Sequence, residues 1–267
     1  MTSSKPREIV AIGDVHGTKK GLEEILRHAG LIDPDGAWTG GNRVLVQTGD
    51  LIDRGRWGRR CYDLLKDLQP QARDSGGEVV MLIGNHELMV LQGTPWRPED
   101  LTNPTKFGQT VIHDIMARTV KAAHAEQGYL FSHAGVRSRL RERLLGTRSV
   151  SSSVDATEAL AQAINEQLQE AVRKVMFAVD KALTKDAWAH PIFSDEGVFW
   201  NRAVGEVSSA GAGAIRQVVG HSVHTRIHAS SDRRIHDIDV AICAGGRAYL
   251  RVENGRPIPV DLASPSR

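Results

Sequence analysis

The stretch from Val44 to Gly55, which reads VLVQTGDLIDRG, decides the fold of this chain. It opens with a short apolar run at residues 44–46, which is typical of a buried strand. The run passes through a glycine into Asp50, Asp53 and Arg54, so charged side chains follow the strand end closely. Open α/β sheets place their sites at the carboxyl ends of their strands. We therefore expect a buried strand here, with a polar site at its end.

The same unit of strand, small residue and polar side chain recurs along the chain. Apolar runs at 8–12, 79–83, 130–131 and 218–219 are followed by Gly13-Asp14-Val15-His16-Gly17, Gly84-Asn85-His86-Glu87, Ser132-His133-Ala134-Gly135 and Gly220-His221-Ser222. Helical patterns separate the first three strands, one after Thr18 and one around Tyr62 to Leu68. Buried strands that alternate with helices predict a layered α/β fold.

A longer helix is expected in the middle of the chain. Apolar residues recur at steps of three and four from Leu160 to Leu183, which predicts one face of a helix in an insertion around residues 150–185. We expect this face to cover the core, with a partner-binding helix as the less favoured alternative. Strands expected at 235–240 and 247–252 predict a second, largely antiparallel sheet. The prediction is a single domain over residues 1–267, with two β-sheets flanked by helices.

Composition and charge exclude several classes of protein. Hydrophobic residues make up 40% and charged residues 25% of the 267 residues, which is enough to bury a core. Lys plus Arg total 34 and Asp plus Glu total 32, so the net charge of +2 argues against a nucleic-acid partner. Cys61 and Cys243 are too few for a disulfide framework or a thiolate zinc cluster. With no signal-peptide pattern and no membrane-length apolar run, we expect a cytoplasmic protein without a membrane partner.

The residue types at the five strand ends favour metal chemistry. Carboxylate and amide oxygens mixed with imidazole nitrogens suit Mn, Fe, Zn or Ni, whereas a calcium site uses oxygen ligands alone. Asp50 is able to bridge, with further ligands on both sides, which suits a pair of divalent ions about 3.5–4 Å apart. One such motif alone is common in ordinary turns. Five of them in this order, each at a strand end, predict a two-metal centre.

These motifs resemble those of the metallophosphoesterase superfamily and, within it, the phosphoprotein phosphatase family. The family pattern of GDxHG, GDxxDRG, GNHE, a later HxG and a later GH is present here in order, from Asp14 to His221. The sequence around Gly49 and Gly220 is similar to bacterial-type members, including the Shewanella-like phosphatases. The resemblance implies a calcineurin-like metallophosphoesterase sandwich of two β-sheets flanked by helices, with a dimetal site at the strand ends.

The resemblance also implies a role for each motif residue. Asp14 and His16 would hold the first ion, Asp50 would bridge both ions, and Asn85, His133 and His221 would hold the second. His86, held by Asp53, would act as the general acid, and the substrate phosphate would be bound by Arg54, Arg202 and Asn85. The implied reaction is hydrolysis of a phosphate monoester by water activated between two divalent metal ions, with Mn favoured in vitro. The implied substrate is a protein phosphorylated on Ser, Thr or Tyr, or a small phosphoester.

Two features of the motifs bear on the alternatives. Dinucleoside polyphosphate hydrolases of the Ap4A type also resemble this chain, but they tend to lack an acidic residue at the position of Asp53. Nucleotide hydrolysis is therefore the alternative function, and an inactive phosphoprotein-binding scaffold ranks lower because every ligand position is intact. The last motif places His224 one residue further from His221 than in the Gly-His-x-His of the wider superfamily, so His224 is not expected to bind metal.

Two further features have a functional and a structural interpretation. Arginines at positions 137, 139, 141 and 143 follow His133 closely. They form either an electropositive rim that steers acidic or phosphorylated substrates or a solvated helix face, and the solvated face is favoured. Trp96 lies in a segment that could cover the site, where packing is favoured over stacking on a substrate ring.

Overall fold

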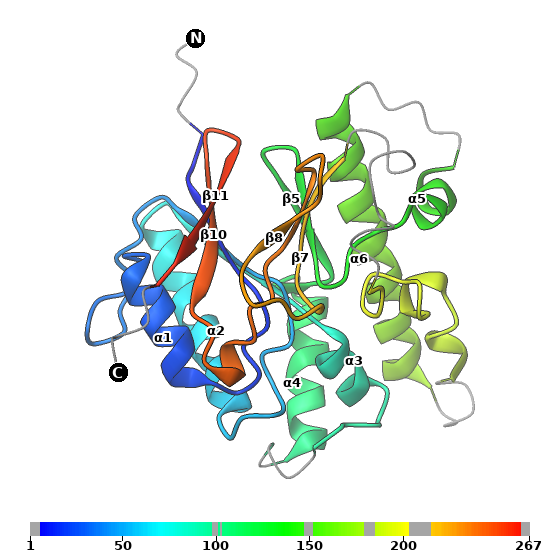
Figure 1. Ribbon diagram of the computed structural model, residues 1–267. Helices are drawn as coiled ribbons and strands as arrows, with labels where there is room; N and C mark the ends of the chain where they lie inside the picture. Colours follow the sequence, from blue (N-terminus) through cyan, green and yellow to red (C-terminus); the bar gives the residue numbers. More distant parts are fainter. Residues whose placement is uncertain are drawn as a thin grey trace.

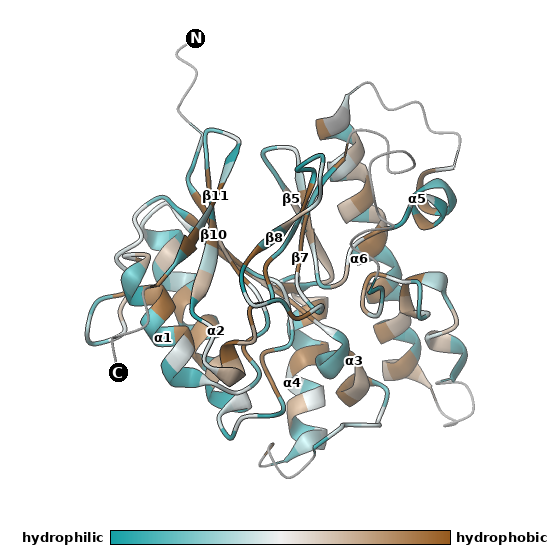
Figure 2. Ribbon diagram, in the orientation of Figure 1, coloured by the Kyte–Doolittle hydropathy of each residue, from teal (hydrophilic) through white to brown (hydrophobic). Residues whose placement is uncertain are grey.

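The computed structural model describes residues 6–97, 101, 103–146, 152–178, 185–202 and 215–262. Two β-sheets form the centre of the molecule, and helices cover their outer faces (Figure 1). Apolar residues concentrate on the strands and on the helix faces turned toward them (Figure 2). The predicted α/β architecture of two sheets flanked by helices is confirmed.

The first sheet brings the amino-terminal strands into one parallel array. Its order is β11-β10-β1-β2-β3-β4, with β1 Ile9–Ile12, β2 Val44–Gln47, β3 Glu78–Leu82, β4 Val120–Lys121, β10 Ala248–Glu253 and β11 Arg256–Asp261. β1 to β4 run parallel, and their register pairs Val10 with Leu45 and Leu45 with Val79. β1 and β2 are buried along their whole length, which explains their continuous apolar runs. The carboxyl ends of these strands consequently meet at one edge of the sheet.

The second sheet is mixed. Its order is β5-β6-β7-β9-β8, with β5 Ala123–Glu126, β6 Tyr129–Ser132, β7 Arg216–Val219, β8 His228–Ala229 and β9 Ile235–Asp237. β7 runs parallel to both β6 and β9, whereas β5 and β8 pair antiparallel at the two edges.

The prediction of one largely antiparallel sheet in the second half of the chain is therefore wrong. β10 does not belong to the second sheet. It pairs antiparallel with β1 in the first sheet. The 3-10 helix η3 (Ile242–Ala244) and the left-handed Gly245 redirect the chain between β9 and β10. Alternating apolar residues identify a strand, but they do not specify the strand with which it pairs.

The helices lie between the strands and over the sheets. They are α1 Lys19–His28, α2 Gly58–Asp74, α3 Asn85–Leu91, α4 Pro104–Met116, α5 Ser138–Leu145, α6 Ser153–Phe177 and the 3-10 helix η2 Pro191–Phe193. α1 follows Thr18 as predicted and buries Leu22, Ile25 and Leu26. α4 begins after Asn103, whose side chain accepts a hydrogen bond from the backbone N–H of Lys106 at 2.9 Å.

α6 is the long helix that the apolar periodicity predicts. It packs against β5 and β6, and its residues Leu160, Ile164, Leu168 and Val172 are buried, so the expected covering role is confirmed. The expected end of this helix at Leu183 lies outside the described residues. Among the described residues, none of the helices combines the length and apolar character that a membrane crossing requires.

Candidate active site

The five predicted motifs meet where the two sheets bring their strand ends together. β1, β2 and β3 end in register, and the backbone N–H of Gly220 after β7 donates to the carbonyl of His133 after β6 at 2.8 Å. The predicted metal ligands are all buried: Asp14, His16, Asp50, Asn85, His133 and His221. Residues from positions 14 to 221 therefore form one cluster, as the strand-end argument requires.

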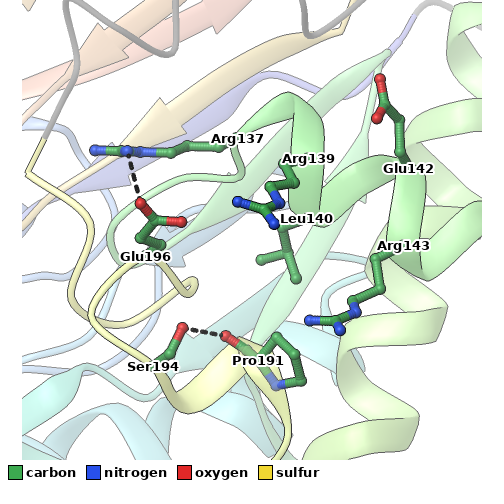
Figure 3. A pocket seen from close by; sticks show the side chains of 8 residues that line it. All are labelled: Arg137, Arg139, Leu140, Glu142, Arg143, Pro191, Ser194 and Glu196. Atoms are coloured by element: carbon green, nitrogen blue, oxygen red, sulfur yellow. Dashed lines mark hydrogen bonds and ion pairs between the residues drawn. The ribbon is translucent and has the colours of Figure 1, made fainter.

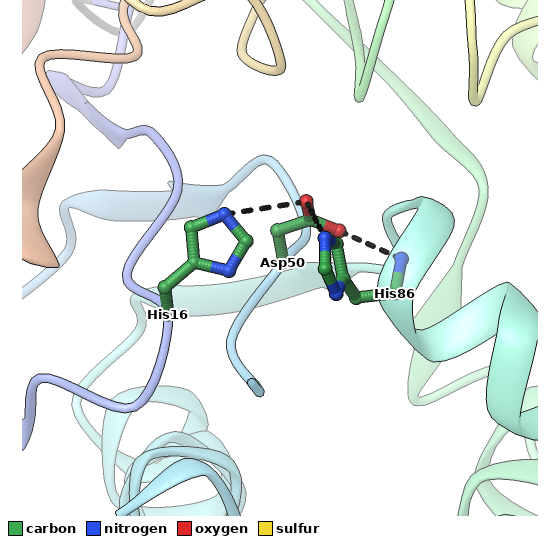
Figure 4. A group of neighbouring side chains, drawn as sticks. All are labelled: His16, Asp50 and His86. Carbon is green, nitrogen blue, oxygen red and sulfur yellow. Dashed lines mark hydrogen bonds and ion pairs between the residues drawn. The ribbon is translucent and has the colours of Figure 1, made fainter. Parts of the chain in front are cut away.

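Asp50 lies at the centre of this cluster. Its Oδ2 is 3.6 Å from His16 Nε2 and 3.8 Å from His86 Nε2 (Figure 4). The same oxygen is 3.6 Å from His133 Nε2. The Oδ1 of Asp50 accepts a hydrogen bond from the backbone N–H of His86 at 3.0 Å. Among the described residues, two groups have the spacing of metal ligands: His16 with Asp50 and His86, and Asp50 with His133 and His221. Because Asp50 belongs to both groups, it is positioned to bridge two ions.

Backbone carbonyls orient two of the imidazole rings. His16 Nδ1 donates to the carbonyl of Ile52 at 2.9 Å, and His133 Nδ1 donates to the carbonyl of Thr48 at 3.0 Å. A carbonyl oxygen only accepts, so each Nδ1 holds the proton and each Nε2 keeps its lone pair. Both Nε2 atoms face Asp50. This pattern is typical of metal-binding histidines, in which a hydrogen bond from one ring nitrogen fixes the orientation of the ring and the other nitrogen binds the metal.

The contacts of His133 suit a bound cation. Its Nε2 lies 2.9 Å from Asn85 Oδ1 and 3.1 Å from His221 Nδ1. With the proton of His133 on Nδ1, the Nε2 atom and the amide oxygen of Asn85 are two acceptors facing each other. A positive ion between such lone pairs satisfies both of them. The residues present therefore fit a second ion position at Asn85, His133 and His221.

The protonation states agree with metal ligation. Burial lowers the pKa of His16 to about 3 and that of His221 to about 4, and it lowers the pKa of His133 well below its ordinary value. These imidazoles are consequently neutral near pH 7, which is the form that binds metal. Burial also raises the pKa of Asp50 to about 7, an effect that the positive charges of His86 and Arg54 offset only in part. Divalent ions would supply further positive charge.

Asp14 lies beside the first group of ligands. Its Oδ1 accepts from the backbone N–H of His221 at 3.1 Å, and its Oδ2 is 3.8 Å from His16 Nε2. Burial and the negative charges of Asp239 and Asp50 raise its pKa well above the ordinary value. Asp239, itself buried, is a neighbour that sequence reasoning missed. The signal in the sequence is that the expected strand at 235–240 reads IHDIDV and carries two acidic residues, Asp237 and Asp239.

His86 differs from the other three histidines. Its Nδ1 lies 2.6 Å from Asp53 Oδ2, while its Nε2 faces Asp50. Burial lowers the pKa of His86, but the hydrogen bond to Asp53 and the charges of Asp50, Asp53 and Glu87 outweigh that effect, so its pKa is raised. The protonated form of His86 is consequently more populated than that of an ordinary imidazole at the same pH. An imidazolium donates a proton and does not ligate a metal.

Glu87 fixes the loop that holds Asp50. Its Oε2 accepts from the backbone N–H groups of Asp50 (2.9 Å) and Gly84 (2.8 Å), and its Oε1 accepts from Leu51 (2.9 Å) and Ile52 (3.3 Å). One buried carboxylate thus ties the start of α3 to the loop after β2. Sequence reasoning gave Glu87 no role, although an acidic residue in the first turn of a helix is a signal for this kind of capping.

The backbone of the site is strained. Five site residues have left-handed φ values, namely His16 (45°), Asp50 (57°), Asp53 (65°), Arg54 (61°) and His221 (70°). This conformation costs a non-glycine residue about 1–2 kcal/mol, and such residues cluster at functional sites. Two glycines of the motifs are explained by close approach, since a Cβ at Gly84 would collide with Asp50 Oδ1 and a Cβ at Gly220 with Asp14 Oδ1.

Exposed side chains surround the mouth of the site. Trp96 is 52% exposed, its ring lies 5.0 Å from the ring of His86, and the guanidinium of Arg54 lies 5.6 Å from it. Trp96 therefore packs on His86 and Arg54 with part of its surface and leaves the rest exposed. Arg54 and Arg202 are exposed, without a hydrogen bond or ion pair to the described residues, and both lower the pKa of His221 by their charge, after the larger effect of burial.

His224 lies apart from both candidate metal groups. Its Nε2 is 3.3 Å from Asp237 Oδ2, and its ring stacks on His228 at 4.8 Å. Neither of the two groups formed by the described residues includes it. Its place in the fold agrees with the expectation that it does not bind metal.

Comparisons with known proteins bear on the same segment. Residues 7–222 match the calcineurin-like phosphoesterase family, and this range includes every motif described above. The chain is 28% identical over 268 residues to an uncharacterized protein of Schizosaccharomyces pombe, covering 92% of this chain and 77% of that protein. It is 42% identical over 89 residues to Shewanella-like protein phosphatase 2 of Arabidopsis thaliana, a match that covers 33% of this chain and 23% of that relative.

A solved structure shares both the fold and part of the sequence. The cold-active protein-tyrosine phosphatase of a psychrophilic Shewanella species superposes with a TM-score of 0.66 at 26% identity, covering 95% of this chain and 77% of its own. The fold, the gathered motifs and a family match over most of the length agree with one another. The chain therefore belongs to the calcineurin-like phosphoesterase family and is a metal-dependent phosphatase.

Proposed function

We propose that this protein removes phosphate from phosphorylated proteins, on Ser, Thr or Tyr, by hydrolysing the phosphate monoester. Two divalent ions would be held by Asp14, His16, Asp50, Asn85, His133 and His221. When bound, such ions add positive charge beside the phosphate oxygens and lower the pKa of water. The ligand types suit Mn in vitro and also Fe, Zn or Ni.

The observation that carries this proposal is the pairing of His86 with Asp53 at 2.6 Å. The oxygen that leaves a serine or threonine phosphate is a poor leaving group unless it receives a proton. His86 holds that proton on Nε2, and Asp53 accepts from Nδ1, which fixes the ring and stabilises the charged form. An anhydride such as a dinucleoside polyphosphate releases a phosphate oxygen that leaves without protonation. The acid pair therefore favours monoesters over the nucleotide alternative.

The substrate phosphate would be gripped from the mouth of the site. Arg54 and Arg202 are exposed and form no hydrogen bond or ion pair with the described residues, so their guanidinium N–H groups are available to an anion. Guanidinium groups bind phosphate oxygens in pairs. The amide of Asn85 would contribute a further contact from within the cluster. The phosphoester would thus lie between these arginines and Asp50, with its leaving oxygen toward His86.

The proposed location is the cytoplasm. Cys61 and Cys243 are both free, and Cys61 is buried, where its pKa is raised to about 12. Unpaired thiols suit a reducing compartment. A phosphorylated cellular protein is the partner that this location would supply.

The test compares three substrates on Mn-reconstituted protein. Phosphate release is measured from a phosphothreonine peptide, a phosphotyrosine peptide and diadenosine tetraphosphate, with the Asp50→Asn variant as the blank. In the dinucleotide assay an added phosphatase releases phosphate from the nucleotide products. Turnover of either peptide, with little cleavage of the dinucleotide, is expected. Cleavage of the dinucleotide with inert peptides would move the protein to nucleotide metabolism and overturn the proposal.

A further inference from the structure

A pocket of about 450 Å³ opens beside α5. Arginines line it on one side, and Pro191, Ser194 and Glu196 line it on the other (Figure 3). We propose that this pocket binds an acidic side chain of the substrate protein, close in sequence to the phosphorylated residue. The inference rests on the proposed function and names the kind of phosphoprotein that the site prefers.

The pocket carries excess positive charge. Arg139 and Arg143 lie one helical turn apart on α5 and are exposed, and neither forms a hydrogen bond or ion pair with the described residues. Glu196 is already engaged by Arg137 at 3.5 Å, and Glu142 points away from Pro191 and Ser194 (Figure 3). Two guanidinium groups are therefore left to bind an anion, and a carboxylate matches their paired N–H groups.

A solvated helix face does not explain this arrangement. On α2 the guanidinium of Arg59 pairs with Asp63 one turn away at 2.8 Å, as exposed helical arginines commonly do. On α5 the residue one turn after Arg139 is Arg143, and Glu142, which lies between them in sequence, forms no ion pair with either. For these two residues the proposed pocket takes the alternative interpretation of the arginine run as an electropositive rim.

The pocket is coupled to the phosphate site through Arg137. Its Nε donates to Asn201 Oδ1 at 2.9 Å, and the buried Asn201 immediately precedes Arg202. The backbone also joins the two walls, since Ala134 N–H donates to the carbonyl of Val198 at 2.7 Å. The walls of the pocket are thus continuous with the segments that bear His133 and Arg202. One polypeptide can place its phosphate at Arg202 and a neighbouring carboxylate at Arg139.

The test uses charge reversal in the pocket with a matched control. The variant is Arg139→Glu/Arg143→Glu, and the control is Arg118→Glu/Arg256→Glu, which makes the same charge change at two exposed arginines outside the pocket. Each protein, loaded with Mn, is assayed on a phosphopeptide with an acidic flank, on the same peptide with Gln in place of each acidic residue, and on p-nitrophenyl phosphate.

Wild type is expected to prefer the acidic peptide by about fivefold in kcat/KM, mainly through KM. The pocket variant should lose this preference, whereas the control and all rates on p-nitrophenyl phosphate should stay within about twofold of wild type. Equal turnover of the two peptides by wild type, or an equal loss of preference in the control, would overturn the pocket assignment but not the proposed function. Hydrolysis of p-nitrophenyl phosphate without turnover of either peptide would overturn the proposed function, and the pocket assignment with it.

Discussion

The buried cluster around Asp50 and the exposed rim around Trp96 are held in different ways. In the cluster, backbone groups fix the side chains: Asp50 accepts from His86 N–H, and His133 donates to the Thr48 carbonyl. On the rim, the exposed Trp96 makes ring contacts alone among the described residues, with the guanidinium of Arg54 at 5.6 Å and the imidazole of His86 at 5.0 Å. The difference indicates a division of labour. Backbone hydrogen bonds fix the buried side chains that would hold charge in place. The rim side chains that would meet the substrate have no such bonds within the described part of the chain.

The strongest test of this division is Asp50→Asn. The amide keeps the shape of the side chain but cannot supply a shared negative charge to two ions, so kcat/KM on p-nitrophenyl phosphate should fall at least about a thousandfold. Because burial raises the pKa of Asp50, the metal-free variant should unfold at a temperature no lower than that of metal-free wild type. Activity and metal content are both measured. The control is Asp63→Asn, because Asp63 pairs with Arg59 on α2 and lies outside the buried cluster. Retention of a tenth of the activity would show that Asp50 is not the bridge.

The second test concerns the proton donor. His86→Asn should lower kcat on a phosphoserine peptide by about a hundredfold, and much less on p-nitrophenyl phosphate, whose leaving oxygen needs no proton. Asp53→Asn should show the same dependence on the leaving group with a smaller loss, since Asp53 acts through His86. An equal slowing of both substrates would contradict the general-acid role.

The cluster could be predicted from the sequence because strand ends and ligand types are local features. Asp14, Asp50 and Asn85 each follow a parallel strand, and parallel strands in register bring their ends together. The pairing of β10 with β1 could not be predicted, since it depends on contacts distant in sequence. The local pattern signals the bond of Glu87 to Gly84, but its bonds to Asp50, Leu51 and Ile52 join segments distant in sequence and could not be predicted.

Glu87 supplies the third test, because it supports the cluster without belonging to it. In Glu87→Gln, the amide nitrogen faces backbone N–H groups that now lack an acceptor. We expect a loss of about 2 kcal/mol in the free energy of unfolding, measured with urea, and weaker metal retention. Glu170→Gln is the matched control, since Glu170 is exposed and pairs with Arg173 at 2.9 Å, and it should change stability by less than about 0.5 kcal/mol. Equal stabilities would mean that the loop of Asp50 holds its conformation without Glu87.

The smallest expected effect lies on the rim. The half-exposed ring of Trp96 lies beside His86, where the proposed function puts the leaving group, so a phenyl ring of phosphotyrosine would meet an aromatic face there. Aromatic pairs contribute about 0.5–1.5 kcal/mol, so Trp96→Ala should lower the ratio of kcat/KM for phosphotyrosine over phosphoserine peptides by about threefold to tenfold. Metal content should not change.

Trp57 provides the control for this prediction. It is 45% exposed and lies on Arg60 at 4.2 Å, so it offers a similar exposed ring with an arginine neighbour but makes no ring contact with His86. Trp57→Ala should leave the substrate ratio unchanged. If Trp96→Ala also leaves it unchanged, the rim does not select the leaving group, and discrimination between phosphotyrosine and phosphoserine must arise within the buried cluster, through the proton that His86 provides.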